Sequence, residues 1–139
     1  MRILVTGNLG YIGSVLTPGL TDDGHEVVGL DCGFFRECVL GAVPDDVPTI
    51  LRDIRDVRPE DVTGFDAIIH LAGLSNDPLG ALVPSLTEDI NFHATMRLAN
   101  LAREAGVKRF IYSSSQSMYG ISTTDAELDE DNSVKSPVT

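Results

Sequence analysis

Three glycines at three-residue spacing mark the first part of the sequence that can do chemistry. They are Gly7, Gly10 and Gly13 in TGNLGYIG, which follows the short apolar run Arg2–Thr6. At a strand-to-helix turn, such glycines let a diphosphate approach the backbone N–H groups that open the helix. The first permits the tight turn, the second the close approach and the third the packing of helix on strand. A glycine turn without a ligand shows the same spacing, so the assignment depends on the residues that follow.

An acidic residue stands where a dinucleotide turn needs one. Asp31 lies 18 residues after Gly13, at the end of the apolar run Glu26–Asp31. Its carboxylate can accept hydrogen bonds from both ribose hydroxyls of an adenosine and repels a 2′-phosphate, which favours NAD over NADP. Arg36 lies close enough in sequence to accommodate that phosphate instead. An aspartate that only caps a turn is the structural alternative.

Three later segments also follow expected strands. Asp53 and Ile54 follow the run Thr49–Leu51 and place a carboxylate and an apolar side chain where an adenine could lie. The small residues of Leu71-Ala72-Gly73 allow a close backbone approach to a dinucleotide. Ser113-Ser114-Ser115 ends the last apolar run, where a hydroxyl can hydrogen-bond a substrate oxygen that gains or loses a proton. Three serines equally suit a flexible strand exit.

Taken in order along the chain, these motifs resemble one family. TGNLGYIG, Asp31, Asp53-Ile54, HLAG, Asn91 with Thr95, and VKRFIYSSSQSMYG are similar to the N-terminal half of the extended short-chain dehydrogenase/reductases, which include the NAD-dependent nucleotide-sugar epimerases and dehydratases. The resemblance covers the whole chain and implies NAD as cofactor, a nucleotide sugar as substrate and a possible homodimer. It implies that Ser115 is the catalytic hydroxyl, which hydrogen-bonds the sugar hydroxyl being oxidised. The implied NAD contacts are Gly7, Gly10, Tyr11, Ile12 and Gly13 for the pyrophosphate, Asp31 for the ribose, Asp53 and Ile54 for the adenine, and Leu71, Ala72, Gly73 and Asn91 toward the nicotinamide.

Two departures from the family pattern bear on activity. The family's Tyr-x-x-x-Lys is missing, since none of Tyr11, Tyr112 and Tyr119 has a lysine four residues later, and in relatives that tyrosine would fall just beyond Thr139. That tyrosinate is the general base, so we expect a fragment of a longer enzyme with little or no activity alone. Gln116 and Ser117 occupy positions that hold an Asp-Glu pair in the dehydratase branch, which favours epimerisation or keto-reduction.

The elements that must position these residues alternate between apolar runs and amphipathic stretches, as in βαβ units. We expect an α/β fold, a Rossmann-type doubly wound parallel sheet of order 3-2-1-4-5 that is cut off before a C-terminal substrate lobe. Residues 1–120 form its NAD-binding domain, and residues 121–139 an acidic loop that leads toward the absent Tyr-x-x-x-Lys. The expected strands are Arg2–Thr6, Glu26–Asp31, Thr49–Leu51, Asp66–Ala72 and Lys108–Ser114.

Two helices have local signals. The first runs from about Tyr11 to Asp23, with a kink or an early end at Pro18-Gly19. The second runs from Leu86 to Ala105, where Ser85 and Glu88 form a Ser-x-x-Glu capping box and Gly106 suits a left-handed C-cap.

Composition narrows the classes of function. The 139 residues carry a formal net charge of −11, which disfavours nucleic acid and anionic membrane surfaces as partners. No apolar run approaches the roughly 20 residues of a membrane span, and MRILVTG lacks the features of a signal peptide, so we expect a cytoplasmic protein. Cys32 and Cys38 have no histidine neighbours and give neither a disulfide framework nor a zinc site.

Three functions fit these observations. The first is the coenzyme-binding half of an NAD-dependent nucleotide-sugar epimerase or dehydratase that works by hydride transfer through a keto-sugar intermediate. The second is a non-enzymatic NAD(P)-binding sensor of the same fold. The third is a simple NAD-dependent ketoreductase that acts on a small alcohol or ketone.

Overall fold

A single parallel sheet organises the chain. The computed structural model describes residues 1–38, 47–120, 129 and 131, so most of the acidic loop predicted over 121–139 lies outside the described residues. The strands are β1 (Arg2–Thr6), β2 (Glu26–Asp31), β3 (Thr49–Leu51), β4 (Ala67–His70) and β5 (Arg109–Tyr112). All pairings are parallel and the order is β3-β2-β1-β4-β5, which confirms the predicted fold class and topology.

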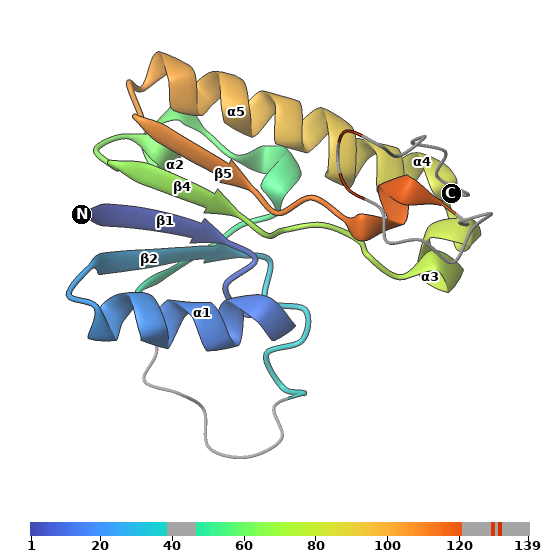
Figure 1. The fold of residues 1–139 in the computed structure, drawn as a ribbon, viewed down its shortest axis with the longest axis horizontal. Coiled ribbons are helices and arrows are strands. Elements are labelled where there is room, and N and C mark those ends of the chain that lie inside the picture. The colour runs from blue at the N-terminus through green and yellow to red at the C-terminus, as the bar shows by residue number, and fades with distance from the viewer. Residues whose placement is uncertain (39–46, 121–128, 130, 132–139) are drawn as a thin grey trace.

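Helices cover both faces of this sheet, as the continuous apolar strands require. Helix α1 (Tyr11–Asp22) lies on one face, and α2 (Pro59–Val62) and α5 (Thr95–Glu104) lie on the other (Figure 1). The short helices α3 (Asp77–Leu82) and α4 (Pro84–Glu88) lie beyond the carboxyl end of β4 (Figure 1). Two 3₁₀ turns follow strands, Ile54–Asp56 after β3 and Gln116–Tyr119 after β5.

The two faces bury separate apolar clusters. Alternate residues of β1 divide between them, because Ile3 and Val5 face α1 while Leu4 faces α2 and α5. The larger cluster lies under α5 and includes Leu30, Ile68 and Leu98, all fully buried. The two clusters bury most of the inner strands β1, β2 and β4 and so hold the ends of these strands in fixed positions.

The helix predicted over 86–105 is three consecutive pieces. Helix α4 begins at Pro84 with Val83 as N-cap and no side-chain cap, a π-helical segment spans Asp89–Ala94, and α5 follows. The predicted Ser85 cap is wrong, because a proline suits the first position of a helix and starts this one earlier. The predicted end is confirmed. Gly106 has φ +77°, and the hydrogen bond from Val107 N to Ala102 O completes a Schellman motif.

The early end predicted at Pro18 does not occur, since α1 runs through the proline to Asp22. Pro18 cannot donate to the carbonyl one turn earlier, but side chains around it bond the helix backbone. The hydroxyl of Thr17 donates to Gly13 O at 2.9 Å and that of Thr21 to Thr17 O at 3.0 Å.

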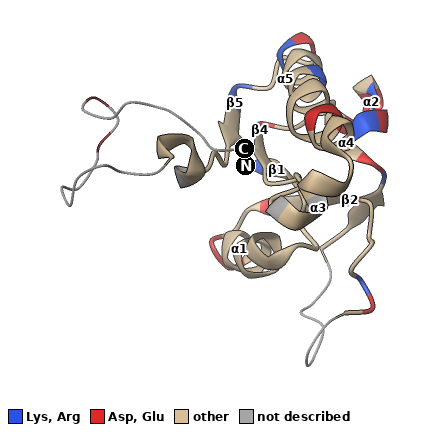
Figure 2. Cartoon of the chain, turned by 90° about the vertical axis from the view of Figure 1, so that its right-hand side faces the viewer, with Lys and Arg blue, Asp and Glu red and all other residues tan. Residues whose placement is uncertain are grey.

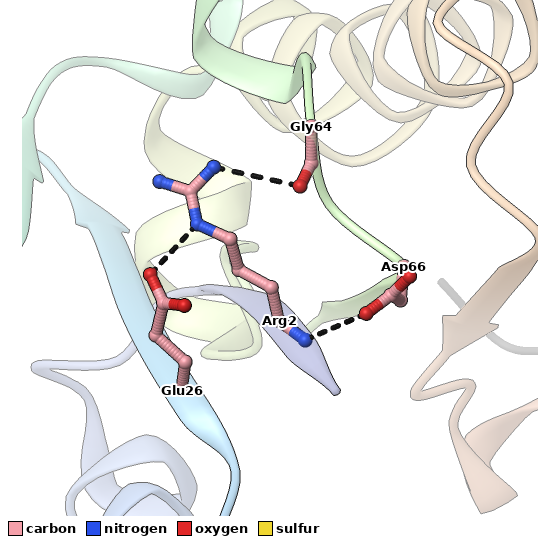
Figure 3. Close-up of polar contacts among 4 residues, drawn as sticks. All are labelled: Arg2, Glu26, Gly64 and Asp66. Atoms are coloured by element: carbon pink, nitrogen blue, oxygen red, sulfur yellow. Dashed lines mark hydrogen bonds and ion pairs between the residues drawn. The ribbon is translucent and has the colours of Figure 1, made fainter.

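Polar contacts of Arg2 hold together the amino-terminal edge of the sheet (Figure 3). Its Nε donates to Glu26 Oε1 at 2.8 Å, its Nη1 to Gly64 O at 3.4 Å and its backbone N to Asp66 Oδ2 at 2.8 Å. The guanidinium also lies 4.5 Å from the centre of the Phe65 ring. Within the described part of the chain, no helix has the length and apolar character needed to cross a membrane.

Candidate functional site

The carboxyl ends of the five strands bring the predicted residues to one edge of the sheet, the edge that faces the viewer in Figure 2. Along this edge the order is Asp53 after β3, Asp31 at the end of β2, the glycine turn after β1, Leu71–Gly73 after β4 and Ser115 after β5. Neighbouring strands lie about 4.8 Å apart, so the five exits form a row about 19 Å long. Open parallel sheets bind ligands along such an edge.

Two of the three glycines are required by close backbone contacts, one with the exit of β4 and one within the turn. Gly7 has φ +74°, and a Cβ there would lie 2.8 Å from Ala72 N, so the turn packs directly on the exit of β4. A Cβ on Gly13 would lie 2.3 Å from Gly7 O, so the first turn of α1 packs on the loop itself. A Cβ on Gly10 would meet only Gly7 O, at 3.2 Å. Gly10 is therefore the glycine whose missing side chain leaves room for a ligand.

The start of α1 offers free hydrogen-bond donors at this point. Gly10 is the N-cap, with no side-chain cap, and the first intrahelical bond runs from Ser14 N to Gly10 O. Backbone N–H groups at the first positions of a helix have no intrahelical acceptor. Those of Tyr11 and Ile12 donate to no residue that the structure describes, and both side chains are exposed. Together with the space above Gly10, these donors fit the diphosphate of a dinucleotide.

Asp31 joins the end of β2 to the glycine turn. Its Oδ2 accepts from Leu9 N at 3.2 Å and its Oδ1 from Gly33 N at 2.8 Å. Each carboxylate oxygen has two lone pairs, so acceptor capacity remains for ribose hydroxyls. Asp31 can therefore cap the turn and also accept hydrogen bonds from a ribose, the two roles that the sequence left as alternatives.

A cavity of about 260 Å³ opens beside Leu9. Arg36 lines it together with Thr49 and Leu51, the first and last residues of β3. The residue that the sequence marked as able to accommodate a 2′-phosphate therefore borders the same part of the edge as the turn held by Asp31.

Asn8 is a structural residue of the turn that sequence reasoning missed. Its side chain is buried, its Nδ2 donates to Thr49 Oγ1 at 2.9 Å, and it occupies the space that a Cβ on Gly29 would fill, only 2.2 Å from its amide. It therefore links the turn to β2 and β3. The available signal was a glycine in the middle of the buried strand EVVGLD, because such glycines mark a close approach.

Asp53 is held by its neighbour Arg55. Arg55 Nε donates to Oδ1 at 3.0 Å and Nη2 to Oδ2 at 2.6 Å, while Arg55 N also donates to Oδ1 at 2.9 Å. The hydrogen bonds from the Arg55 side chain lower the pKa of the Asp53 carboxyl. Ile54 differs from the expectation, because its side chain is buried in the core cluster and cannot cover an adenine ring. Only the backbone of Ile54 is left to meet a ligand.

Asn91 clamps the loop that leaves β4. Its Oδ1 accepts from Leu74 N and its Nδ2 donates to Leu74 O, both at 2.7 Å. A Cβ on Gly73 would lie 3.1 Å from the same Oδ1, so the glycine lets the loop approach the amide. Leu71 packs against the cluster on the α1 side of the sheet. This exit therefore offers a ligand its backbone and the small residues Ala72 and Gly73, with Asn91 behind them.

Ser115 lies two residues beyond the point where β5 leaves β4. Ser113 N still donates to His70 O at 3.2 Å, and Ser115 then caps the following 3₁₀ turn, its Oγ accepting from Ser117 N at 3.1 Å. The side chain is exposed. Because the oxygen accepts from the backbone, its proton remains available to donate to a substrate oxygen.

Comparison with known proteins finds a family match, related sequences and similar solved structures. The model of the NAD dependent epimerase/dehydratase family matches residues 3–139. A UDP-glucose 4-epimerase of Klebsiella pneumoniae is 38% identical over 129 residues, which cover 86% of this chain and 93% of that protein. A UDP-glucose 4-epimerase of Mycolicibacterium smegmatis is 37% identical over 130 residues. Among solved structures, MoeE5 in complex with UDP-glucose and NAD superposes with a TM-score of 0.83 at 28% identity.

The chain is shorter than most of these relatives. It spans 41% of the Mycolicibacterium smegmatis protein, with 86% of its own residues in the match. It covers 44% of the MoeE5 chain, with all of its own residues in the superposition.

Proposed function

Because this chain belongs to the NAD dependent epimerase/dehydratase family, we propose that it is the coenzyme-binding half of an oxidoreductase that acts on nucleotide sugars. The family confirms the prediction of NAD as the cofactor. One observation carries the rest of the proposal. Along the edge, an adenine acceptor, a ribose acceptor, a helix N-terminus, a small-residue exit and a serine follow one another in the order in which NAD and then a substrate present those groups.

The adenosine and diphosphate half of NAD has its partners on β1, β2 and β3. The amides of Tyr11 and Ile12 would hold the diphosphate, for which Gly10 leaves room, and Asp31 would accept hydrogen bonds from the ribose hydroxyls. Asp53 accepts from the adenine amine and Ile54 offers its backbone. Because the charge of Asp53 is balanced by Arg55, an uncharged base can bind beside it without leaving a carboxylate unpaired.

The residues that would receive the nicotinamide half of NAD and the substrate follow β4 and β5. Bound NAD supplies the hydride acceptor for a sugar carbon. Ala72, Gly73 and Asn91 border the path to that ring, and Asn91 keeps the loop in place through Leu74. Ser115 would donate a hydrogen bond to the sugar oxygen and so orient the hydroxyl that becomes a ketone. The proton of that hydroxyl would pass to the tyrosinate of the Tyr-x-x-x-Lys that the family resemblance implies.

The type of reaction is epimerisation or keto-reduction rather than dehydration. Ser117 is exposed in the 3₁₀ turn after Ser115 and has a hydroxyl where the dehydratase branch has an acid. A hydroxyl is a poor general acid or base near neutral pH. UDP-glucose 4-epimerases are prominent among the relatives, which supports the first of the two reactions and a UDP-sugar as substrate.

Titration of the chain with NAD and NADP, followed by isothermal calorimetry, tests this function. We expect NAD to bind more tightly than NADP, and Asp31→Ala to weaken NAD binding by about tenfold to a hundredfold, because one or two hydrogen bonds to a charged acceptor are lost. Glu26→Gln is the matched control, since it removes a carboxylate at the opposite edge of the sheet. A wild-type chain that does not bind NAD would refute the function, and unchanged affinity in Asp31→Ala would remove Asp31 from the site.

A further inference from the structure

One buried histidine, His70, connects the glycine turn to helix α5. His70 is 1% exposed, its Nδ1 lies 2.6 Å from Thr6 Oγ1, and its Nε2 lies 2.8 Å from Thr95 Oγ1. Thr6 is the last residue of β1 and His70 the last of β4, and the two are paired in register. Residues paired in this way project to the same face of a sheet, so the imidazole fills the space between β1 and the start of α5.

Thr6 is the residue through which this bridge reaches the site. It immediately precedes Gly7, its backbone O accepts from Leu71 N at 3.1 Å, and its Oγ1 lies 3.4 Å from Ala72 N. Gly7 itself packs on Ala72 so closely that a Cβ would not fit. Any shift of Thr6 would therefore move both the turn that offers the diphosphate donors and the exit of β4.

Both ring nitrogens of His70 are used in this bridge. A neutral imidazole has one N–H and one acceptor nitrogen, so one threonine hydroxyl donates to the ring and the other accepts from it. Burial lowers the pKa of His70 to about 4, so the ring is neutral at pH 7. The ring is also packed against Phe110 and Tyr112 of β5, with centroid distances of 6.0 and 5.8 Å. The imidazole is therefore held from three elements at once.

We infer that His70 is a positioning residue of the coenzyme site: held between Thr6 and Thr95, it fixes the glycine turn relative to α5 in the arrangement that the diphosphate of NAD requires. This inference rests on the proposed function. Thr95 lies four residues after Asn91, which clamps Leu74, so one face of the helix holds both the turn and the β4 loop. Asn91 acts directly on its loop, whereas Thr95 reaches the turn only through His70.

Thr95→Val is the variant that separates positioning from general stability. Valine keeps the shape of threonine and removes only the hydroxyl, and that hydroxyl bonds His70 rather than the turn. We expect NAD binding to weaken about fivefold, as the loss of one buried hydrogen bond allows, and the amide resonances of Gly7 and Gly10 to shift in ¹⁵N–¹H spectra. Thr87→Val is the matched control, because Thr87 Oγ1 is buried without a hydrogen-bond partner among the described residues. It leaves both readouts as in the wild type.

His70→Phe completes a double-mutant cycle. Phenylalanine fills a similar volume beside Phe110 and Tyr112 but bonds neither threonine, so we expect NAD binding to weaken about tenfold. In the His70→Phe variant the hydrogen bond from His70 to Thr95 is already absent, so adding Thr95→Val should cause no further loss of NAD affinity. Additive losses, or a Thr95→Val variant that matches Thr87→Val in both readouts, would overturn the inference.

The experiments distinguish a failure of the proposed function from a failure of the inference about His70. If the wild type does not bind NAD, the coenzyme assignment is wrong. The amide shifts then still decide whether His70 holds the turn, since they are measured without ligand. If the wild type binds NAD and Thr95→Val neither weakens binding nor shifts Gly7 and Gly10, the function stands and the inference is wrong.

Discussion

Asp53 and His70 have pKa values that are both lowered, for different physical reasons. Hydrogen bonds from the Arg55 side chain stabilise the charged form of Asp53, whereas burial destabilises the charged form of His70. Asp53 therefore contributes stability that is present above its ordinary pKa of 3.8 and is lost as the pH falls through its lower folded value. His70 acts in a different range, because its ordinary pKa is 6.5 and its folded pKa is about 4.

The first prediction concerns stability below neutral pH. Between pH 6.5 and about 4, the ordinary and folded pKa values of His70, the unfolded chain takes up a proton on His70 that the folded chain does not. The free energy of unfolding therefore decreases as the pH falls through this range. The decrease is about 2 kcal/mol between pH 8 and pH 5. Urea denaturation of the wild type and of His70→Phe at both pH values measures it. The variant should lack this part of the pH dependence, and equal slopes in the two proteins would contradict the buried neutral imidazole.

Among individual residues, the sequence predicted those whose type is characteristic of a dinucleotide site. The three glycines and Asp31 were predicted from their spacing together with the apolar runs that precede them, and the structure brings them together through Leu9 N and Gly7. Asn8 and the buried side chain of Ile54 were not predicted. Both depend on which way a side chain turns inside a loop, which is decided by packing against β2 and the core and has no periodic signal.

Among the elements, strands were predicted better than helix details. Each apolar run became a strand, because a short apolar run bounded by glycine or proline has few alternatives. The inner strands β1, β2 and β4 are the ones in which half or more of the residues are buried. The helix over 86–105 was predicted as one regular element, and its π-helical segment Asp89–Ala94 was missed. A π-helical segment changes the hydrogen-bond ladder without changing composition, and such segments are frequent at functional sites. Here the segment carries Asn91.

The second prediction tests the Asn91 clamp. Asn91→Ala leaves both backbone groups of Leu74 without their partners and should destabilise the β4 loop by about 1–3 kcal/mol. Hydrogen exchange read at the Leu74 amide should become faster, while the Val107 amide in the cap of α5 keeps its protection. An unchanged Leu74 exchange rate would show that the loop is held by other contacts.

For the whole molecule, the helix that carries Asn91 and Thr95 has a second, outward face. Phe92 and Met96 lie four residues apart and are 56% and 49% exposed, so they form an apolar pair on the surface of that helix. We propose that this face pairs with a second copy of the chain. The proposal follows from the homodimer that the sequence resemblance implies, and this exposed apolar pair is the surface at which we test it.

The third prediction is therefore a change in oligomeric state. In sedimentation velocity the wild type should show a concentration-dependent dimer, and Phe92→Glu should sediment as a monomer at every concentration, because a carboxylate cannot be buried unpaired in an apolar interface. Ile12→Glu, exposed on α1 at the coenzyme edge, serves as the surface control. A wild type that is monomeric up to high concentration, or a Phe92→Glu variant that still dimerises, would rule this interface out.

The most direct test of the account is the location of bound NAD on the sheet. In ¹⁵N–¹H spectra recorded during an NAD titration, the resonances of Gly10, Tyr11, Ile12 and Asp31 should move, together with those of Ala72 and Gly73. The resonances of Arg2, Glu26, Gly64 and Asp66, which lie at the opposite edge (Figure 3), should not. Movement at that opposite edge with a silent glycine turn would contradict the claim that this chain holds its coenzyme along the carboxyl ends of its strands.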